Sequence, residues 1–255
     1  MPTATYTTRL FTHYMITCNN CNSTITENFC PSCGLALKPK RIDSHYISHE
    51  IQHLLHVEKG IFFTIRELLI RPGSTIREYI TENRSKLIKP VTLLILTSIL
   101  YSIIDHHYHI GEHGAKQIDK AYAKSAVSTI SHWVQNNMGY ANIIMGVFIA
   151  IWVKIFFRKS GYNIYEITVL LCFVMGLGMF LFSIAALLVG LLHQPIILLV
   201  ATLLVFIYIS WGIGQFFGSR KFLNYVKAIT AYLLGFFTFK YAVLAIGLAY
   251  DYCIR

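Results

Sequence analysis

Four cysteines near the amino end of the chain carry its clearest chemistry. They form two Cys-x-x-Cys pairs with eight residues between them, namely Cys18, Cys21, Cys30 and Cys33. Each pair directs two thiolates toward one point, and four thiolates satisfy a tetrahedral Zn²⁺ at about 2.3 Å per bond. Because such a site has no open position for a substrate water, the pattern predicts a structural zinc ion and not a catalytic one. The alternative is two disulfides or two redox pairs, which a reducing compartment disfavours.

The segment around these cysteines is too short to enclose a hydrophobic core, so we expect metal binding to supply most of its folding free energy. Gly34 directly follows the second pair and allows the backbone turn that such a site needs, and Phe29 is expected to shield the metal. No Lys or Arg lies between Cys18 and Cys33. We therefore predict a small zinc ribbon over residues 1–40 and no nucleic-acid partner.

Two groups of histidines form a second set of candidate metal ligands or pH-sensitive residues, since imidazole binds transition metals and titrates near neutral pH. The first group lies at helical spacing on one face of a helix expected over residues 43–58, and the second lies in a polar loop. A solvated surface is the alternative, because the first group lacks an accompanying carboxylate or cysteine and the second lacks regular ligand spacing. The groups are His45, His49, His53 and His56, and His106, His107, His109 and His113.

The composition of the chain indicates which elements must position these residues. Of 255 residues, 55% are hydrophobic and 13% are charged, whereas a soluble domain carries about 25% charged residues to cover its surface. This shortage excludes a disordered chain, a coiled coil and an ordinary cytosolic enzyme, and it predicts an all-α polytopic membrane protein. Five apolar stretches approach the roughly 20 residues that a membrane-crossing helix needs. They cover residues 87–104, 140–157, 167–192, 195–217 and 226–250.

The formal net charge of +10 is distributed unevenly among the connections. Lys and Arg are retained on the cytoplasmic side of membrane proteins, and here they gather before the first span, between the second and third, and between the fourth and fifth. The loop at 105–139, with an amphipathic helix expected over 115–135, balances basic and acidic residues. We therefore predict a cytoplasmic N-terminus, an external 105–139 loop and an external C-terminus. The basic residues concerned are Arg77, Arg84, Lys86, Lys89, Lys154, Arg158, Lys159, Arg220, Lys221 and Lys227.

Short amphipathic helices are expected beside the membrane. The sequence Thr-Ile-Arg-Glu occurs at 64–67 and again at 75–78, and Thr followed three residues later by Glu is the capping-box arrangement that begins a helix. With Pro72-Gly73 breaking the chain, this predicts one helix over 61–70 and another over 75–86. Their apolar sides either enter the lipid headgroup region or pack on the transmembrane helices, and both alternatives are equally supported. In the first case, anionic headgroups meet Arg66, Arg71, Arg77 and Arg84.

Further motifs follow the cysteine pairs, namely His49-Glu50-Ile51-Gln52-His53, Glu58-Lys59-Gly60, Arg71-Pro72-Gly73, Ile76-Arg77-Glu78-Tyr79, Arg84 and Pro90. With these motifs, residues 18–104 resemble the bacterial membrane proteins of domain-of-unknown-function family 3667. The resemblance implies an N-terminal zinc ribbon, a helical membrane domain and no established reaction. The bacterial origin that the resemblance implies would make the membrane the inner one and the C-terminus periplasmic. We expect three domains: the ribbon, juxtamembrane helices over 41–89, and a transmembrane domain over 90–255.

Two ionisable residues lie within or beside the spans. Lys240 is near the middle of the fifth span, where a charged side chain costs at least about 2.5–3.5 kcal/mol. Glu166 opens the third span and is expected to be too shallow for a direct ion pair with Lys240. The lysine is explained either by snorkelling, carbonyl contacts or aromatic rings such as Phe236, or by an anion or lipid-headgroup site in a cavity.

These features together favour a non-catalytic membrane protein. Its zinc ribbon and basic helices are expected to recruit or regulate a partner protein at the cytoplasmic face, next to anionic lipid headgroups and alone or as a homo-oligomer. The alternative is a transporter or channel that uses Lys240 in a polar cavity. A membrane enzyme ranks last, because the sequence shows no nucleophile with a base, no paired carboxylates and no histidine–acid metal site at the span ends.

Overall fold

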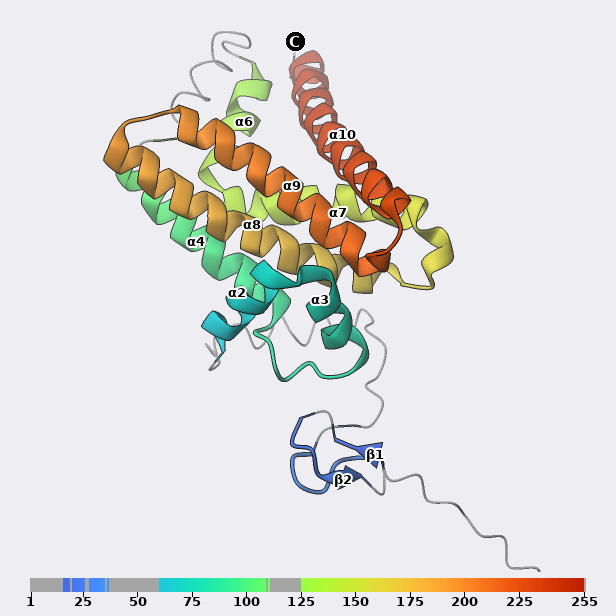
Figure 1. Ribbon diagram of the computed structural model, residues 1–255. Helices are drawn as coiled ribbons and strands as arrows, with labels where there is room; N and C mark the ends of the chain where they lie inside the picture. Colours follow the sequence, from blue (N-terminus) through green and yellow to red (C-terminus); the bar gives the residue numbers. More distant parts are fainter. Residues whose placement is uncertain are drawn as a thin grey trace, which may run out of the picture.

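The computed structural model describes residues 16–18, 20–25, 28–34, 36, 60–108, 110 and 125–254. These residues form a small head and a helical body (Figure 1). The head contains two short antiparallel strands, β1 (Ile16–Thr17) and β2 (Thr24–Ile25), with Thr17 opposite Thr24.

The body is built from helices, and five of them are long and apolar enough to cross a membrane, which confirms the predicted fold class. These five are α4 (Pro90–Tyr108), α7 (Met138–Phe156), α8 (Ile164–Leu192), α9 (Ile196–Gly218) and α10 (Phe222–Ile254). The shorter elements are α2 (Ile61–Ile70), α3 (Pro72–Thr81), α6 (Ala126–Asn136) and the 3₁₀ turn η1 (Arg158–Ser160). The first span begins three residues later than predicted, because Pro90 occupies its first position and needs no amide partner there.

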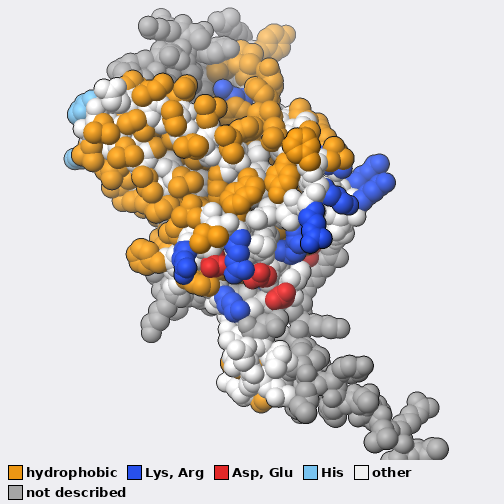
Figure 2. Space-filling view, viewed as in Figure 1, with side chains coloured by type: hydrophobic (Ala, Val, Ile, Leu, Met, Phe, Trp, Pro, Cys, Tyr) orange, Lys and Arg blue, Asp and Glu red, His pale blue; other side chains and the backbone are white. Residues whose placement is uncertain are grey.

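Helix α8 forms the centre of the body. Most of its apolar residues are buried, whereas α10 is largely exposed, and α4 packs along α8 more extensively than any other helix pair does. On the outside, α9 presents a row of exposed side chains at intervals of four residues, including Leu199, Leu203 and Ile207. Such a row is the surface that a helix presents to lipid, and hydrophobic side chains cover the visible face of the helical body (Figure 2).

Glu166 has a structural role at the start of α8. Its carboxylate accepts a hydrogen bond of 2.7 Å from the backbone N–H of Asn163, and the Asn163 side chain accepts one of 2.8 Å from the N–H of Glu166. This reciprocal arrangement is a capping box, which satisfies amides that the first turn of a helix leaves unpaired. The buried carboxylate of Glu166 thus caps the start of α8. This agrees with the expectation that Glu166 lies at the shallow end of the span.

The two capping boxes predicted for α2 and α3 are wrong. Thr64 lies inside α2, where its hydroxyl oxygen accepts a hydrogen bond of 3.0 Å from the backbone N–H of Ile88. Helix α3 begins at Pro72, three residues before Thr75, and the break in the chain falls at Arg71. The physical reason is that proline has a helical φ and lacks an amide, so it begins a helix as readily as it interrupts one.

At the far end of the body, α6 covers Ala126–Asn136 of the helix expected over 115–135. The earlier part of that expected helix lies outside the described residues. The carboxylate of Asp251 in α10 accepts a hydrogen bond of 2.9 Å from the Ala126 N–H, and it also accepts one from the hydroxyl of Ser125. Asp251 therefore caps the start of α6 and joins it to the last turns of α10.

Candidate functional site

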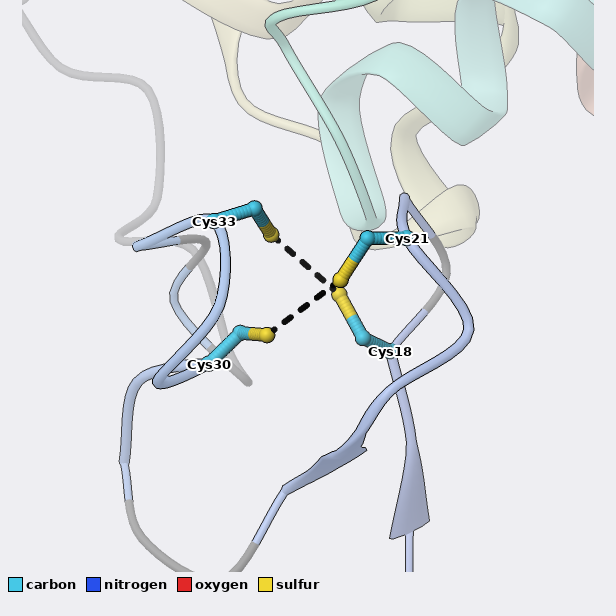
Figure 3. Close-up of side chains that lie close together, drawn as sticks. All are labelled: Cys18, Cys21, Cys30 and Cys33. Carbon is cyan, nitrogen blue, oxygen red and sulfur yellow. Dashed lines mark hydrogen bonds between the residues drawn. The ribbon is translucent and has the colours of Figure 1, made fainter.

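The four cysteines of the head converge on one point, as the sequence predicted. Their Sγ atoms all lie within 4.8 Å of one another and point toward a common centre (Figure 3). The sulfur of Cys18 is 3.6 Å from that of Cys33, and the sulfur of Cys21 is 3.5 Å from that of Cys30. Sulfurs around a tetrahedral metal with bonds of about 2.3 Å lie roughly 3.8 Å apart. All four are free thiols, so the donor set fits a metal ion and not two disulfides.

Each Cys-x-x-Cys turn is closed by a residue with a positive φ. In the first turn the N–H of Asn22 donates to the carbonyl of Cys18 over 3.0 Å, and in the second the N–H of Gly34 donates to the carbonyl of Cys30 over 2.8 Å. The φ angles are 58° at Asn22 and 71° at Gly34. Glycine was recognised in the sequence, whereas Asn22 was missed, although asparagine is among the few side chains that tolerate this conformation.

Ser23 adds a hydrogen bond that sequence reasoning missed. Its hydroxyl lies 2.8 Å from the sulfur of Cys21 and 3.1 Å from the sulfur of Cys30. The hydrogen bond from Ser23 is the largest cause that lowers the pKa of Cys30 from 9.0 to about 6, and it lowers the pKa of Cys21 in the same direction. The arrangement therefore favours thiolate, which is the form that binds a metal.

Phe29 does not shield this cluster, contrary to expectation. Its side chain is 62% exposed, while the burial of the site comes from the cysteines themselves, with Cys18 and Cys30 buried. The backbone of Phe29 pairs with Ala36 in an isolated antiparallel bridge, which holds the residue beside the second turn. The aromatic ring is thus presented outward from a fixed backbone.

Helix α3 packs closely against the end of α9 and is hydrogen-bonded to it. The N–H of Gly73 donates to Oε1 of Gln215 over 2.7 Å, and a Cβ atom added to Gly73 would lie 2.3 Å from the backbone nitrogen of Phe216. The guanidinium of Arg77 donates to the carbonyl oxygens of Gln215, over 3.0 Å, and Phe216. These carbonyls belong to the last turn of α9 and have no helical partner, so Arg77 caps that helix and complements its dipole.

The apolar side of α3 packs on the membrane helices, which decides between the two alternatives for that helix. Ile76 and Tyr79 are buried, and the ring of Tyr79 meets Phe173 of α8 edge to face at 5.0 Å. From α9, the hydroxyl of Tyr208 donates to the carbonyl of Leu68 over 3.1 Å, which ties α2 to the same surface. Phe62 of α2, by contrast, is 85% exposed.

The four arginines predicted to meet lipid headgroups therefore have different surroundings. The guanidinium of Arg77 donates to carbonyl oxygens at the end of α9, and its headgroup contact stays a prediction. Arg71 forms an ion pair of 2.7 Å with Glu67, and Arg84 donates to the carbonyl of Ile80 over 3.4 Å. Arg66 is exposed on α2.

The histidine groups are only partly described. His45, His49, His53, His56, His109 and His113 lie outside the described residues. His106 and His107 are exposed near the end of α4, and the ring of His107 meets that of Tyr108 edge to face at 4.7 Å. Within the residues that the structure describes, no histidine joins a group of three potential metal ligands.

Lys240 lies at the exposed edge of α10. Its Nζ is 5.4 Å from the centre of the Phe236 ring, which agrees with the cation–π alternative. The lysine also borders an open pocket of about 610 Å³ between α6, α7 and α10, together with Asn142 and Gln135. Glu166 does not line that pocket, so the two ionisable residues are not brought together there.

The fold and the cysteine cluster define a helical membrane protein with a small four-thiolate head. The family described as "Protein of unknown function (DUF3667)" matches residues 58–102, which comprise α2, α3 and most of α4. This match supports the family resemblance drawn from the sequence, over the residues that it covers. No curated protein and no solved structure matches the chain.

Proposed function

We propose that this protein is a non-catalytic membrane protein whose zinc-bound head recruits or regulates a partner protein at the cytoplasmic face of the bacterial inner membrane. The observation that carries the proposal is the convergence of four thiols on one point. Tetrahedral sulfur sites select zinc or iron–sulfur clusters, and a single ion with four thiolates has no free position for a substrate. The metal would thus hold a binding surface in shape.

The head offers a surface of the kind that protein partners use. Phe29 is 62% exposed although its backbone is held in the bridge to Ala36. Exposed aromatic side chains on rigid backbones are enriched at protein interfaces, since they bury a large area and lose little rotamer freedom. This supports partner binding at Phe29.

A contact between the head and the body supports a regulatory role. The side-chain amide of Asn83 donates to Oδ1 of Asn20, between the first two cysteines, over 3.3 Å. Asn83 follows α3, whose residues Gly73 and Arg77 are bound to the end of α9. A partner on the head would therefore be held close to the end of the transmembrane helices.

The distribution of basic side chains supports the proposed orientation, with the head and the short helices on the cytoplasmic side. The ends of α7 and α9, the start of α10 and the α2–α3 hairpin lie at one end of the body, where basic side chains gather in Figure 2. Such clustering favours the cytoplasmic side for that end, for the head over 1–40 and for the helices over 41–89. Exposed Phe62 and Arg66 on α2 suit the headgroup layer of an anionic bilayer.

The test is site-specific photo-crosslinking in cells with the full-length protein. A photoreactive phenylalanine analogue at Phe29 should give one defined adduct with another protein, and the adduct should disappear when Cys18→Ser is added. The same analogue at Tyr252, which is 86% exposed at the opposite end, is the control and should not give that adduct. Absence of an adduct at Phe29, or its persistence in Cys18→Ser, contradicts recruitment by the folded head.

The competing hypothesis is a transporter or channel that uses Lys240. It predicts solute flux into vesicles that contain the purified protein, and a loss of that flux in Lys240→Gln. Recruitment predicts vesicles without such flux.

A further inference from the structure

Four basic side chains line one pocket at the end of the body where α7 and α9 end and α10 begins. Arg158 and Lys159 come from the turn between α7 and α8, whereas Lys221 and Lys227 come from the turn between α9 and α10 and the start of α10. We call this the basic pocket. It encloses about 430 Å³, which is within the usual range for small-ligand sites, and no Asp or Glu lines it.

The two turns that form the basic pocket are fixed in place. The side-chain amide of Asn224 donates to the carbonyl oxygens of Phe217 and Gly218 over 3.1 Å each, which closes the turn after α9. The rings of Phe157 and Phe217 stack at 3.9 Å with an angle of 10° between them, and this stack joins one turn to the other. The position of the basic groups is thus set before any ligand arrives.

The positive charge of the basic pocket is not balanced by the protein. In the part of the chain that the structure describes, none of the four basic residues forms an ion pair, and Nζ of Lys227 lies 5.8 Å from the centre of the Phe157 ring. Arg71, in contrast, pairs with both Glu67 and Glu78. The preference of Lys and Arg for the cytoplasmic side of a membrane explains only why these basic residues lie on that side. It does not explain why four of them face one pocket.

We propose that the basic pocket binds a phosphate group, in the first place that of an anionic phospholipid. Arg and Lys are the residues that bind phosphate oxygens, and a pocket without carboxylates attracts anions. Phe222 and Leu223 beside Lys221 are 81% and 61% exposed, so apolar and basic side chains adjoin at this site. This combination suits the boundary between headgroups and acyl chains. The proposal concerns residues other than those of the metal head, and it is independent of partner recruitment.

Binding to the full-length protein in detergent tests this proposal. Calorimetric titrations with a short-chain phosphatidylglycerol, a short-chain phosphatidylcholine and inorganic phosphate separate the sources of the phosphate group. We expect the anionic lipid to bind at least about tenfold more tightly than the zwitterionic one, since each basic residue near a lipid surface contributes on the order of a fivefold change in affinity.

Matched variants assign the binding to the pocket. The double variant Lys221→Gln/Lys227→Gln should weaken anionic-lipid binding by about tenfold or more. The control Arg220→Gln/Lys86→Gln removes the same charge from exposed residues that do not line the pocket, and it should leave the affinity within about twofold. Arg158→Gln, at an exposed position, provides a single change that keeps both turns and should weaken binding about fivefold.

Each outcome decides the question. Tight binding of inorganic phosphate, weakened by the pocket variants alone, retains the phosphate site and makes its ligand a soluble one. Equal weakening by pocket and control variants, or equal affinity for the two lipids, overturns the proposal. Neither result bears on zinc content or on crosslinking at Phe29.

Discussion

The head and the helical body of this protein are held together by different means. Among the described residues of the head, the buried side chains are Cys18 and Cys30, and the exposed fraction of Phe29 is 62%. In the body, Phe173 and Phe216 are fully buried, together with many leucine and isoleucine side chains. Burial of one such side chain contributes about 1.5–3 kcal/mol. The comparison teaches that packing organises the body, whereas the described part of the head has a cluster of four cysteines in place of an apolar core.

Removal of one thiolate should have the largest effect, and only on the head. Cys30→Ser leaves three thiolates, and because structural zinc binding contributes on the order of 10 kcal/mol to such small domains, the metal and the fold of the head should both be lost. Zinc content per protein, measured by mass spectrometry of the metal, checks this. Cys253→Ser changes an exposed cysteine outside the cluster and should keep the full metal content. A Cys30→Ser protein that retains its zinc contradicts the predicted coordination.

Gly73→Ala should destabilise the body and leave the head unchanged. The new methyl group would lie 2.3 Å from the backbone nitrogen of Phe216, and backbone cannot move aside as a flexible side chain does. We expect a loss of about 2–3 kcal/mol, measured as a lower thermal unfolding midpoint in detergent. Gly146→Ala is the control, because its Cβ would meet only the sulfur of Met175 at 3.5 Å. Equal midpoints for the two variants would mean that α3 does not approach α9 so closely.

Arg77→Gln should produce a smaller loss of stability in the body. It removes the charged donor to the carbonyls of Gln215 and Phe216, for which we expect about 1–2 kcal/mol. The control is Arg66→Gln, which changes an exposed arginine in the preceding helix α2 and should alter the unfolding midpoint little. If the two substitutions have the same effect, Arg77 acts as a surface charge and not as a cap.

Ser23→Ala should have the smallest effect, seen in the pH dependence of metal binding. A thiol whose pKa is lowered by folding contributes stability above its ordinary pKa of 9.0, and this contribution is lost as the pH falls through about 6. Without the Ser23 hydroxyl the pKa of Cys30 rises, so protons displace the metal at a higher pH. Zinc release monitored with a coloured chelator during acid titration measures the shift. A midpoint that stays the same or falls contradicts the role of Ser23.

Features encoded by neighbouring residues could be predicted from the sequence, and features that join distant segments could not. The apolar runs that became α8 and α9 exceed the length of a membrane crossing, and the spacing of the cysteines specifies their convergence. The partners of Gly73 and Arg77 lie at Gln215 and Phe216, some 140 residues later, and no local pattern indicates that pairing. Likewise, Lys221 could be used in the sequence only to predict the orientation of the chain in the membrane. Its convergence with Arg158 depends on how the turn between α9 and α10 packs against the turn between α7 and α8.

Hydrogen exchange on the full-length protein, with and without a zinc chelator, tests most directly the claim that a metal organises the head while packing organises the body. Loss of the metal should abolish amide protection within residues 16–36 and leave the protection of residues 90–254 unchanged. Continued protection of the head after its metal has been removed, or a loss that extends through the helices, would contradict the claim.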